Sequence, residues 1–201
     1  MAFQDGRDRF VVVKLAPWLN NKCAGFPDGR DHINVTGLSG GFAAEHLPPP
    51  GELLWCDGVP FLTPDFHGAA NDNLALEGET IATPPGPCRR LHLWGFADLA
   101  QMGARITLVF SGGRRRGLWL EFSSWKAEAP GRGERLGPWS PVTRTADRDV
   151  PQPLKTWVQS VPVDDDGDLV AIEVEDMSLL HVLALTLERP GRPAASGRWA
   201  P

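Results

Sequence analysis

The feature that most constrains the fold is a strict alternation of residue types in two neighbouring segments. The segment 104–110 reads ARITLVF, in which every second residue is a large apolar one. The segment 117–125 reads GLWLEFSSW, and its alternation places Trp119 and Trp125 on the face opposite Leu120. A period of two predicts strands that bury one face. The connection between them, SGGRRR, contains two glycines and predicts a β-hairpin.

Further strands are expected at short spacing along the chain. The 22 glycines and 19 prolines suit many short strands joined by turns. The last candidate is apolar on both faces, as a central strand of a sandwich would be. The only helical turn that we expect lies near 96–103. This pattern predicts an all-β fold, an antiparallel β-sandwich or jelly roll. The other strand candidates are 9–15, 53–61 (broken by Asp57-Gly58), 90–96, 155–163, 168–174 and 179–187.

Three segments interrupt the strand pattern. Residues 126–154 are rich in Pro, Gly and Arg and are expected to form a long loop. The segment 163–168, VDDDGD, is expected to be a hairpin turn, with a calcium site as the alternative. The tail 189–201 has the composition of a disordered end, which leaves one β-sandwich domain over residues 1–188.

Charge and cysteine content exclude several classes of function. The net charge is −5, and the one arginine run, 114–116, is expected to be a solvated hairpin tip. We therefore expect no nucleic-acid partner. The three cysteines are widely spaced, so neither a zinc site nor a disulfide framework is indicated. No apolar run is long enough to span or anchor in a membrane and no leader segment is recognisable, so we expect a cytoplasmic protein without a membrane partner.

The order of several motifs resembles a known family. GLSGGFAAEHLPPPGE, CDGVPFLTPDF, NDNLALEGETIATPPG, RRLHLWGFAD, ARITLVFSGG, LEFSSW and LLHVLALTLE follow one another along the chain. Together they resemble the galactose-binding-like β-sandwich accessory modules of bacterial glycoside hydrolases, over roughly residues 9–188. The resemblance implies a jelly-roll fold and carbohydrate binding, and it does not imply catalysis.

Two polar segments are the candidate ligand site. They are enriched in Asn, Asp and His, and the loops at one end of a jelly roll often meet, so we expect the two segments to form one site. An Asn side chain both donates and accepts hydrogen bonds, which suits a sugar hydroxyl. The alternatives are turns stabilised by these same side chains and a structural calcium ion; no other cofactor and no metal ligands are assigned. The candidates are Asn20, Asn21, Asp28 and His32 in the segment 18–35, and Asn71 and Asn73 in the segment 64–81.

Tryptophan is the other candidate for ligand contact. The chain has eight tryptophans and no tyrosine, and an exposed indole offers a rigid face with a polar N–H. We assign Trp94 and Trp125 to the ligand site, with packing beneath a loop as the alternative for each. His181, in the apolar segment LLHVLAL, is expected to be a hydrogen-bonded core residue instead.

Catalysis has one set of candidate residues. His67 lies in a loop beside Asp65 and close in sequence to Asp72, and an imidazole oriented by a carboxylate can shuttle a proton. No GxSxG motif indicates a nucleophilic serine.

Three functions remain open from the sequence. The first is a free-standing module that binds a carbohydrate or polar small molecule through its end loops and tryptophans. The second is an intracellular enzyme that modifies small molecules on the same scaffold, using His67 with Asp65 or Asp72. The third is an interaction module whose exposed tryptophans bury against a partner or a second copy, which would make it a homodimer.

Overall fold

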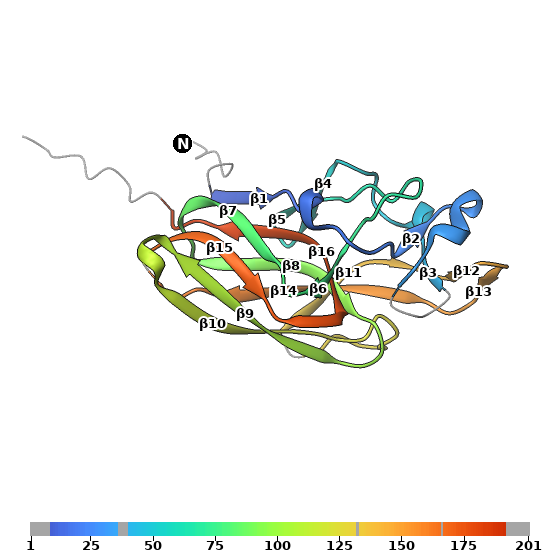
Figure 1. The fold of residues 1–201 in the computed structure, drawn as a ribbon. Helices are drawn as coiled ribbons and strands as arrows, with labels where there is room; N and C mark the ends of the chain where they lie inside the picture. The colour runs from blue at the N-terminus through green and yellow to red at the C-terminus, as the bar shows by residue number, and fades with distance from the viewer. Residues whose placement is uncertain (1–8, 36–39, 132, 166, 192–201) are drawn as a thin grey trace, which may run out of the picture.

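The computed structural model describes residues 9–35, 40–131, 133–165 and 167–191, and it confirms an all-β antiparallel sandwich. The larger sheet has the strand order β1–β16–β8–β14–β11, with β6 also paired to β16 (Figure 1). Its strands are β1 (Phe10–Val13), β6 (Leu74–Glu77), β8 (Arg90–Ala97), β11 (Glu134–Ser140), β14 (Leu154–Pro162) and β16 (Asp176–Glu188). Because β1 pairs with β16, the two ends of the described chain meet in one sheet.

The second layer is a four-stranded antiparallel sheet with the order β10–β9–β15–β7. Its strands are β7 (Thr80–Pro87), β9 (Met102–Phe110), β10 (Arg115–Phe122) and β15 (Asp168–Val174). The predicted hairpin is confirmed, since β9 and β10 pair with Leu118 opposite Ile106 and Leu120 opposite Ala104. Directly paired residues point to the same face, so the apolar alternation of both strands faces one core.

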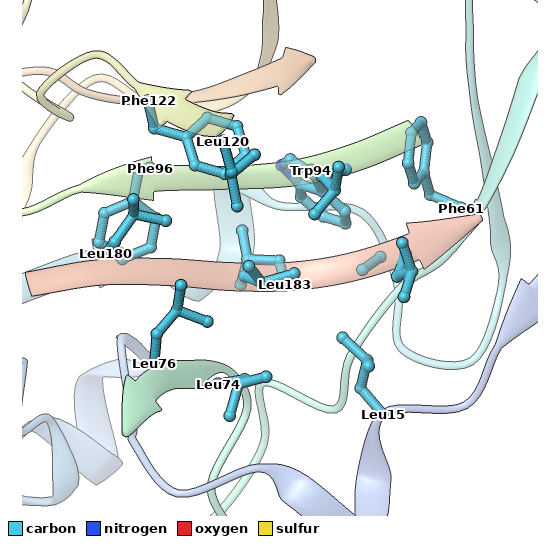
Figure 2. Packing of buried hydrophobic residues seen from close by; sticks show 14 of the residues in the cluster. Leu15, Phe61, Leu74, Leu76, Trp94, Phe96, Leu120, Phe122, Leu180 and Leu183 are labelled. Carbon is cyan, nitrogen blue, oxygen red and sulfur yellow. The ribbon is translucent and has the colours of Figure 1, made fainter. Parts of the chain in front are cut away.

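The core between these two sheets is closely packed. An internal void between them holds about 10 Å³ and is lined by Leu93, Ile106, Leu120, Ile172 and other aliphatic side chains from both sheets. Figure 2 shows buried side chains of β6, β8, β10 and β16, among them Phe96, which lies on the opposite face of the larger sheet. A void of this size holds one water molecule at most, so it offers no room for a ligand.

The opposite face of the six-stranded sheet is covered by the N-terminal part of the chain. The Phe96 ring of β8 stacks on His181 of β16 at 4.7 Å and meets Phe42 edge-on at 5.3 Å. Further along, the Thr186 hydroxyl donates to the carbonyl of Pro60 at 2.5 Å. The larger sheet is therefore buried on both faces, which explains why β16 is apolar on both sides.

Two small sheets and three of the described 3₁₀ helices make up this layer, whereas the fourth, η5 (Ser111–Gly113), is the tip of the β9–β10 hairpin. At one end of the molecule, β2 and β3 are parallel to each other, and β3 pairs with the hairpin β12–β13 (Figure 1). The other small sheet is the hairpin β4–β5, which turns at Asp57 and Gly58 with φ of 50° and 77°. The remaining elements are β2 (Ala24–Gly25), β3 (Gly40–Ala43), β4 (Leu53–Cys56), β5 (Val59–Leu62), β12 (Thr143–Thr145), β13 (Asp149–Val150), η2 (Ala16–Trp18), η3 (Pro27–His32), η4 (Ala44–His46) and η5 (Ser111–Gly113).

A buried arginine joins the parts of the small end sheet. Arg144 of β12 is 1% exposed. Its guanidinium donates to both carboxylate oxygens of Glu45 at 2.6 and 2.7 Å and to both of Asp149 at 2.9 and 3.0 Å. It also donates to the carbonyl of Gly25 at 2.8 Å, so one side chain links β2, η4, β12 and β13.

Four predictions about the connecting segments need correction or fall partly outside the structure. Residues 126–154 do not form one long loop, because they contain β11, β12 and β13. The segment 163–168 is no hairpin turn, since β14 and β15 belong to different sheets and the segment crosses between them. The segment 96–103 contains no helical turn; β8 runs to Ala97 and β9 starts at Met102. Of the predicted tail 189–201, residues 192–201 lie outside the described residues, whereas Arg189 is described and donates to the carbonyls of Pro84 and Pro87.

Candidate functional site

The two polar segments do meet, as the sequence predicted. Asn21 and Asn73 form an isolated antiparallel bridge. The amide of Asn21 donates to the carbonyl of Asn73 at 3.1 Å, and the amide of Asp72 donates to the carbonyl of Asn21 at 2.9 Å. Residues about fifty positions apart are thereby held side by side above the six-stranded sheet.

Most asparagines of this junction bond within the protein and are not free for a ligand. The Asn20 amide group donates to the carbonyl of Ala75 at 2.8 Å and to Glu79, and its oxygen accepts from the Ala75 amide. The Asn21 side chain donates to the carbonyl of Asn34 at 2.6 Å. Asn20 and Asn21 therefore stabilise the junction of the loops, and the prediction that they contact a ligand finds no support in the geometry.

Asp72 is a buried structural anion, not a partner of His67. It is 0% exposed, and its carboxylate accepts from the amides of Cys23 and Ala24 and from Asn73, and pairs with Lys22 at 3.0 Å. These donors satisfy the buried carboxylate within the protein. The prediction that Asp72 supplies acid–base chemistry in the loop is wrong, because Asp72 lies beneath the loop.

The polar network continues from Asp72 to the core histidine. The Asn73 amide group donates to Asp72 at 2.9 Å and to Asn21 at 3.2 Å, while its oxygen lies 2.8 Å from Nδ1 of His181. His181 is 0% exposed, and burial lowers its pKa to about 4. His181 is thus a neutral, hydrogen-bonded core residue, as the sequence predicted, and Asn73 is its fully buried partner and not a ligand contact.

The two tryptophans assigned to the ligand site lie in the core. Trp94 is 0% exposed and its Nε1 donates to Thr156 at 2.6 Å, whereas Trp125 is 1% exposed and stacks on Phe96 at 5.3 Å. Neither indole has a face open to solvent, so the prediction that they stack on a ligand is wrong. Within the described part of the chain, the tryptophans with large exposed fractions are Trp55, Trp119 and Trp139.

Three of the predicted residues instead gather at an open hollow of about 620 Å³. Asp28 and His32 reach it from η3, and His67 reaches it from the other polar segment. The rest of its lining is Phe26, Pro27, Gly29 and Gly68. The hollow therefore combines the two segments that the sequence placed in one site.

One wall of the hollow is an aromatic stack. The rings of Phe26 and His67 are 4.4 Å apart and inclined by only 19°. Asp65 Oδ1 accepts from the backbone amide of His67 at 2.9 Å and lies 3.2 Å from its Nδ1. Asp65 thus forms the expected Asx turn and also orients the imidazole. When Nδ1 donates to Asp65, the neutral ring has its acceptor at Nε2.

The remaining polar groups of the hollow are exposed. His32 lies 3.8 Å from the carboxylate of Asp31, and both side chains are open to solvent. Asp28 is exposed and has no ion pair or side-chain hydrogen bond with another described residue. The predicted ligand contact Asn71 is exposed but does not line the hollow, and it donates to the carbonyl of Leu19 at 3.3 Å. The hollow thus offers carboxylate and imidazole groups to a ligand from solvent.

A metal centre finds no support in this arrangement. Within the residues that the structure describes, no group of three or more His, Cys, Asp and Glu side chains is placed to hold a metal ion. The same part of the chain contains no helix that is long and apolar enough to cross a membrane.

Sequence reasoning missed the apolar part of the hollow. Phe26 and Pro27 lie inside a polar loop, in the run GFPDG. An aromatic residue in a polar loop was the signal from which a ligand contact could have been predicted. Its meaning depended on His67, about forty residues away, because the exposed face of Phe26 forms a wall only when another ring packs on it.

Comparison with models of protein families assigns the chain to a family. A family model described as the AziU2-like beta-sandwich domain matches residues 10–146, which is more than half of the sequence. The chain belongs to this family. The part of this AziU2-like domain that the family model matches contains both segments that line the hollow and stops before β14, β15 and β16. No protein with a curated description matches the sequence.

Proposed function

We propose that the protein is a binding domain that takes a small, hydroxyl-rich molecule in the hollow lined by Phe26, Asp28, His32 and His67. The observation that carries this proposal is the aromatic stack of Phe26 and His67 beside the exposed polar groups of Asp28 and His32. A sugar ring has an apolar face of C–H groups and a rim of hydroxyls. The stacked rings match the face, and the carboxylate and imidazole groups match the rim.

The resemblance to carbohydrate-binding accessory modules supports a sugar as the ligand class. The volume of about 620 Å³ is within the range of small-molecule sites, although the hollow is open to solvent. A site of this kind is expected to bind weakly, because an open hollow leaves part of the ligand in water.

The experiment uses the imidazole groups of the hollow as reporters. The methyl glycosides of galactose, glucose, mannose and xylose are titrated into the protein, and the imidazole resonances are followed by NMR. At least one glycoside is expected to shift the signals of His32 and His67 and to leave those of His46 unchanged, since His46 is exposed but lies outside the hollow. If no glycoside moves the signals of His32 and His67, the proposal is overturned.

Two variants separate binding from a general change of the loop. Phe26→Ala removes one ring of the stack and is expected to weaken binding by about tenfold or more. His46→Ala is the matched control and is expected to bind like the unaltered protein. Equal binding by Phe26→Ala and the unaltered protein would show that the stack is not the ligand platform.

An enzymatic function on the same site is the second candidate, favoured by the contact of Asp65 with Nδ1 of His67. That contact is the arrangement of a general base, with Asp65 orienting the ring and Nε2 accepting the proton. Here His67→Gln, which also removes one ring of the stack, is expected to weaken binding of the glycoside found above and to abolish its turnover even at saturating glycoside. Turnover that survives in His67→Gln would exclude this role.

A further inference from the structure

The outer face of the four-stranded sheet carries an exposed indole held in a defined position. Trp119 of β10 is 60% exposed. A Cβ atom at Gly103, on the neighbouring strand β9, would come within 2.6 Å of three atoms of the indole. The indole therefore lies against the backbone of Gly103, and its other face is open to solvent.

The guanidinium of Arg105 lies on Gly117, two positions before Trp119 on β10, in the same way as the indole lies on Gly103. Arg105 is paired directly with Trp119 in the register of β9 and β10. A Cβ atom at Gly117 would come within 2.9 Å of the Arg105 guanidinium, so this group lies on Gly117 as the indole lies on Gly103. Since glycine has no side chain, both positions leave room for a flat group on the sheet.

The two groups together make a platform along the hairpin. Gly103 and Gly117 stand at opposite ends of the stretch, because Gly103 is paired with Glu121 and Gly117 with Thr107. Four residues of a strand separate the two pairs, which corresponds to about 13 Å at the usual rise. The indole covers one end and the guanidinium covers the other.

The guanidinium of Arg105 makes no ion pair with an acid among the described residues. The other arginines of this hairpin have ion-pair partners, namely Asp165 for Arg114, Glu173 for Arg115 and Asp164 for Arg116. For Arg105, the part of the chain that the structure describes provides no ion pair. Glu175 is close, but its carboxylate accepts from the backbone amide of Arg105 at 2.9 Å.

We propose that this platform, formed by Trp119 and Arg105 on Gly103 and Gly117, is a second binding site that takes an acidic glycan made of hexuronate units. A pyranose ring stacks on the indole, and a carboxylate further along the glycan pairs with the guanidinium, which is suited to bidentate contact. The net charge of −5 opposes a non-specific attraction of polyanions, so binding depends on this local pair. The site is separate from the hollow, because the hollow is lined by residues of the segments 26–32 and 67–68, none of which belongs to the four-stranded sheet.

The test uses tetragalacturonate and its methyl ester as probes in isothermal titration calorimetry. The two probes share the ring faces and differ in charge. The protein is expected to bind the acid more tightly than the ester by about tenfold or more, because only the acid pairs with Arg105. Absence of tetragalacturonate binding, or equal affinity for acid and ester, would overturn the proposal.

Variants assign the binding to the platform. Trp119→Ala is expected to weaken binding of both probes by about tenfold or more. Gly103→Val retains the indole but displaces it from the sheet, and is expected to weaken binding to a similar degree. Arg105→Gln is expected to remove the preference for the acid while retaining the affinity for the ester.

Controls separate this site from the rest of the surface and from the hollow. Trp139→Ala removes an exposed tryptophan from a different sheet, and Phe26→Ala alters the hollow; both are expected to bind tetragalacturonate like the unaltered protein. Thermal unfolding checks that each variant is folded. Undiminished binding by folded Trp119→Ala would contradict the platform, whereas loss of binding in Phe26→Ala would place the acidic glycan in the hollow instead.

Discussion

Asp98 makes the sharpest prediction about stability, because it is a buried carboxyl group without a partner. It follows the last residue of β8 and is 1% exposed. Neither carboxylate oxygen has a hydrogen-bond partner among the described residues. Burial raises the pKa of Asp98 from 3.8 to about 6, and the charge of Lys126 offsets only part of this rise.

The sign of the effect follows from proton binding. Between pH 4 and 6 the folded protein holds a proton on Asp98 that the unfolded chain has released. Stability therefore falls as the pH rises through this window and stays low above it. A change of pKa from 3.8 to about 6 corresponds to about 3 kcal/mol of the free energy of unfolding, at about 1.4 kcal/mol for each pKa unit.

The perturbation is Asp98→Asn, which keeps the shape and removes the ionisation. The asparagine has a cost of its own for its unpaired amide, but this cost does not depend on pH. The difference in unfolding free energy between Asp98→Asn and the unaltered protein is therefore expected to be about 2–3 kcal/mol more favourable at pH 8 than at pH 4.

The assay is urea unfolding followed by tryptophan fluorescence at both pH values, with linear extrapolation to water. Asp147→Asn is the matched control, since Asp147 is exposed and makes no ion pair with a described residue. The difference for Asp147→Asn is expected to be the same at pH 4 and pH 8. If the difference for Asp98→Asn is also the same at both values, Asp98 is not desolvated, and the reasoning is refuted.

Four other predictions concern the core, the end sheet and the surface. Burial lowers the pKa of His181 from 6.5 to about 4, so between pH 4 and 6.5 the folded state binds fewer protons than the unfolded chain. Stability is therefore lost as the pH falls through this window. In the Asp98→Asn background, His181→Gln is expected to reduce the loss of unfolding free energy between pH 6.5 and 4. Arg144→Met removes the buried guanidinium that pairs with Glu45 and Asp149, and leaves Asp149 paired with Arg30 only. It is expected to lower the unfolding free energy by about 2–4 kcal/mol in urea titrations, whereas a loss below 1 kcal/mol would contradict a joining role. Gly95→Ala would place a Cβ 2.2 Å from a backbone carbonyl of β16 and is expected to cost about 3 kcal/mol, which an unchanged melting temperature would exclude. The homodimer remains a prediction, and sedimentation at increasing protein concentration is expected to show it. Trp139 is exposed on the edge strand β11, so Trp139→Ala is expected to weaken the dimer. A monomer at all concentrations would rule the homodimer out.

The shared position of the two polar loops was predictable, but the roles of their residues were not. Asn, Asp and His were concentrated in the two segments, and these segments do meet at Asn21 and Asn73. The sequence could not separate Asp28, which faces the hollow, from Asp72, which is buried beneath it. The difference arises because Asp72 lies over Lys22 and two backbone amides that reach it from another segment.

Local sequence determined the strands and their turns. Alternation in 104–110 and 117–125 set which residues share a face, and the glycines between them allowed a tight connection. At Asp57 and Gly58, the left-handed backbone favoured by these residue types set the turn of β4–β5. These features depend on neighbours within a few positions, which is why a sequence reveals them.

The tertiary structure decided which strand faces are covered. Trp94 and Trp119 both stand in alternating strands, and nothing in their local sequence distinguishes them. Trp94 is fully buried because the six-stranded sheet is covered on both faces, whereas Trp119 is exposed because the four-stranded sheet has an outer face that is open to solvent. Alternation shows that two side chains point the same way, but only the packing of distant segments determines whether that side meets protein or water.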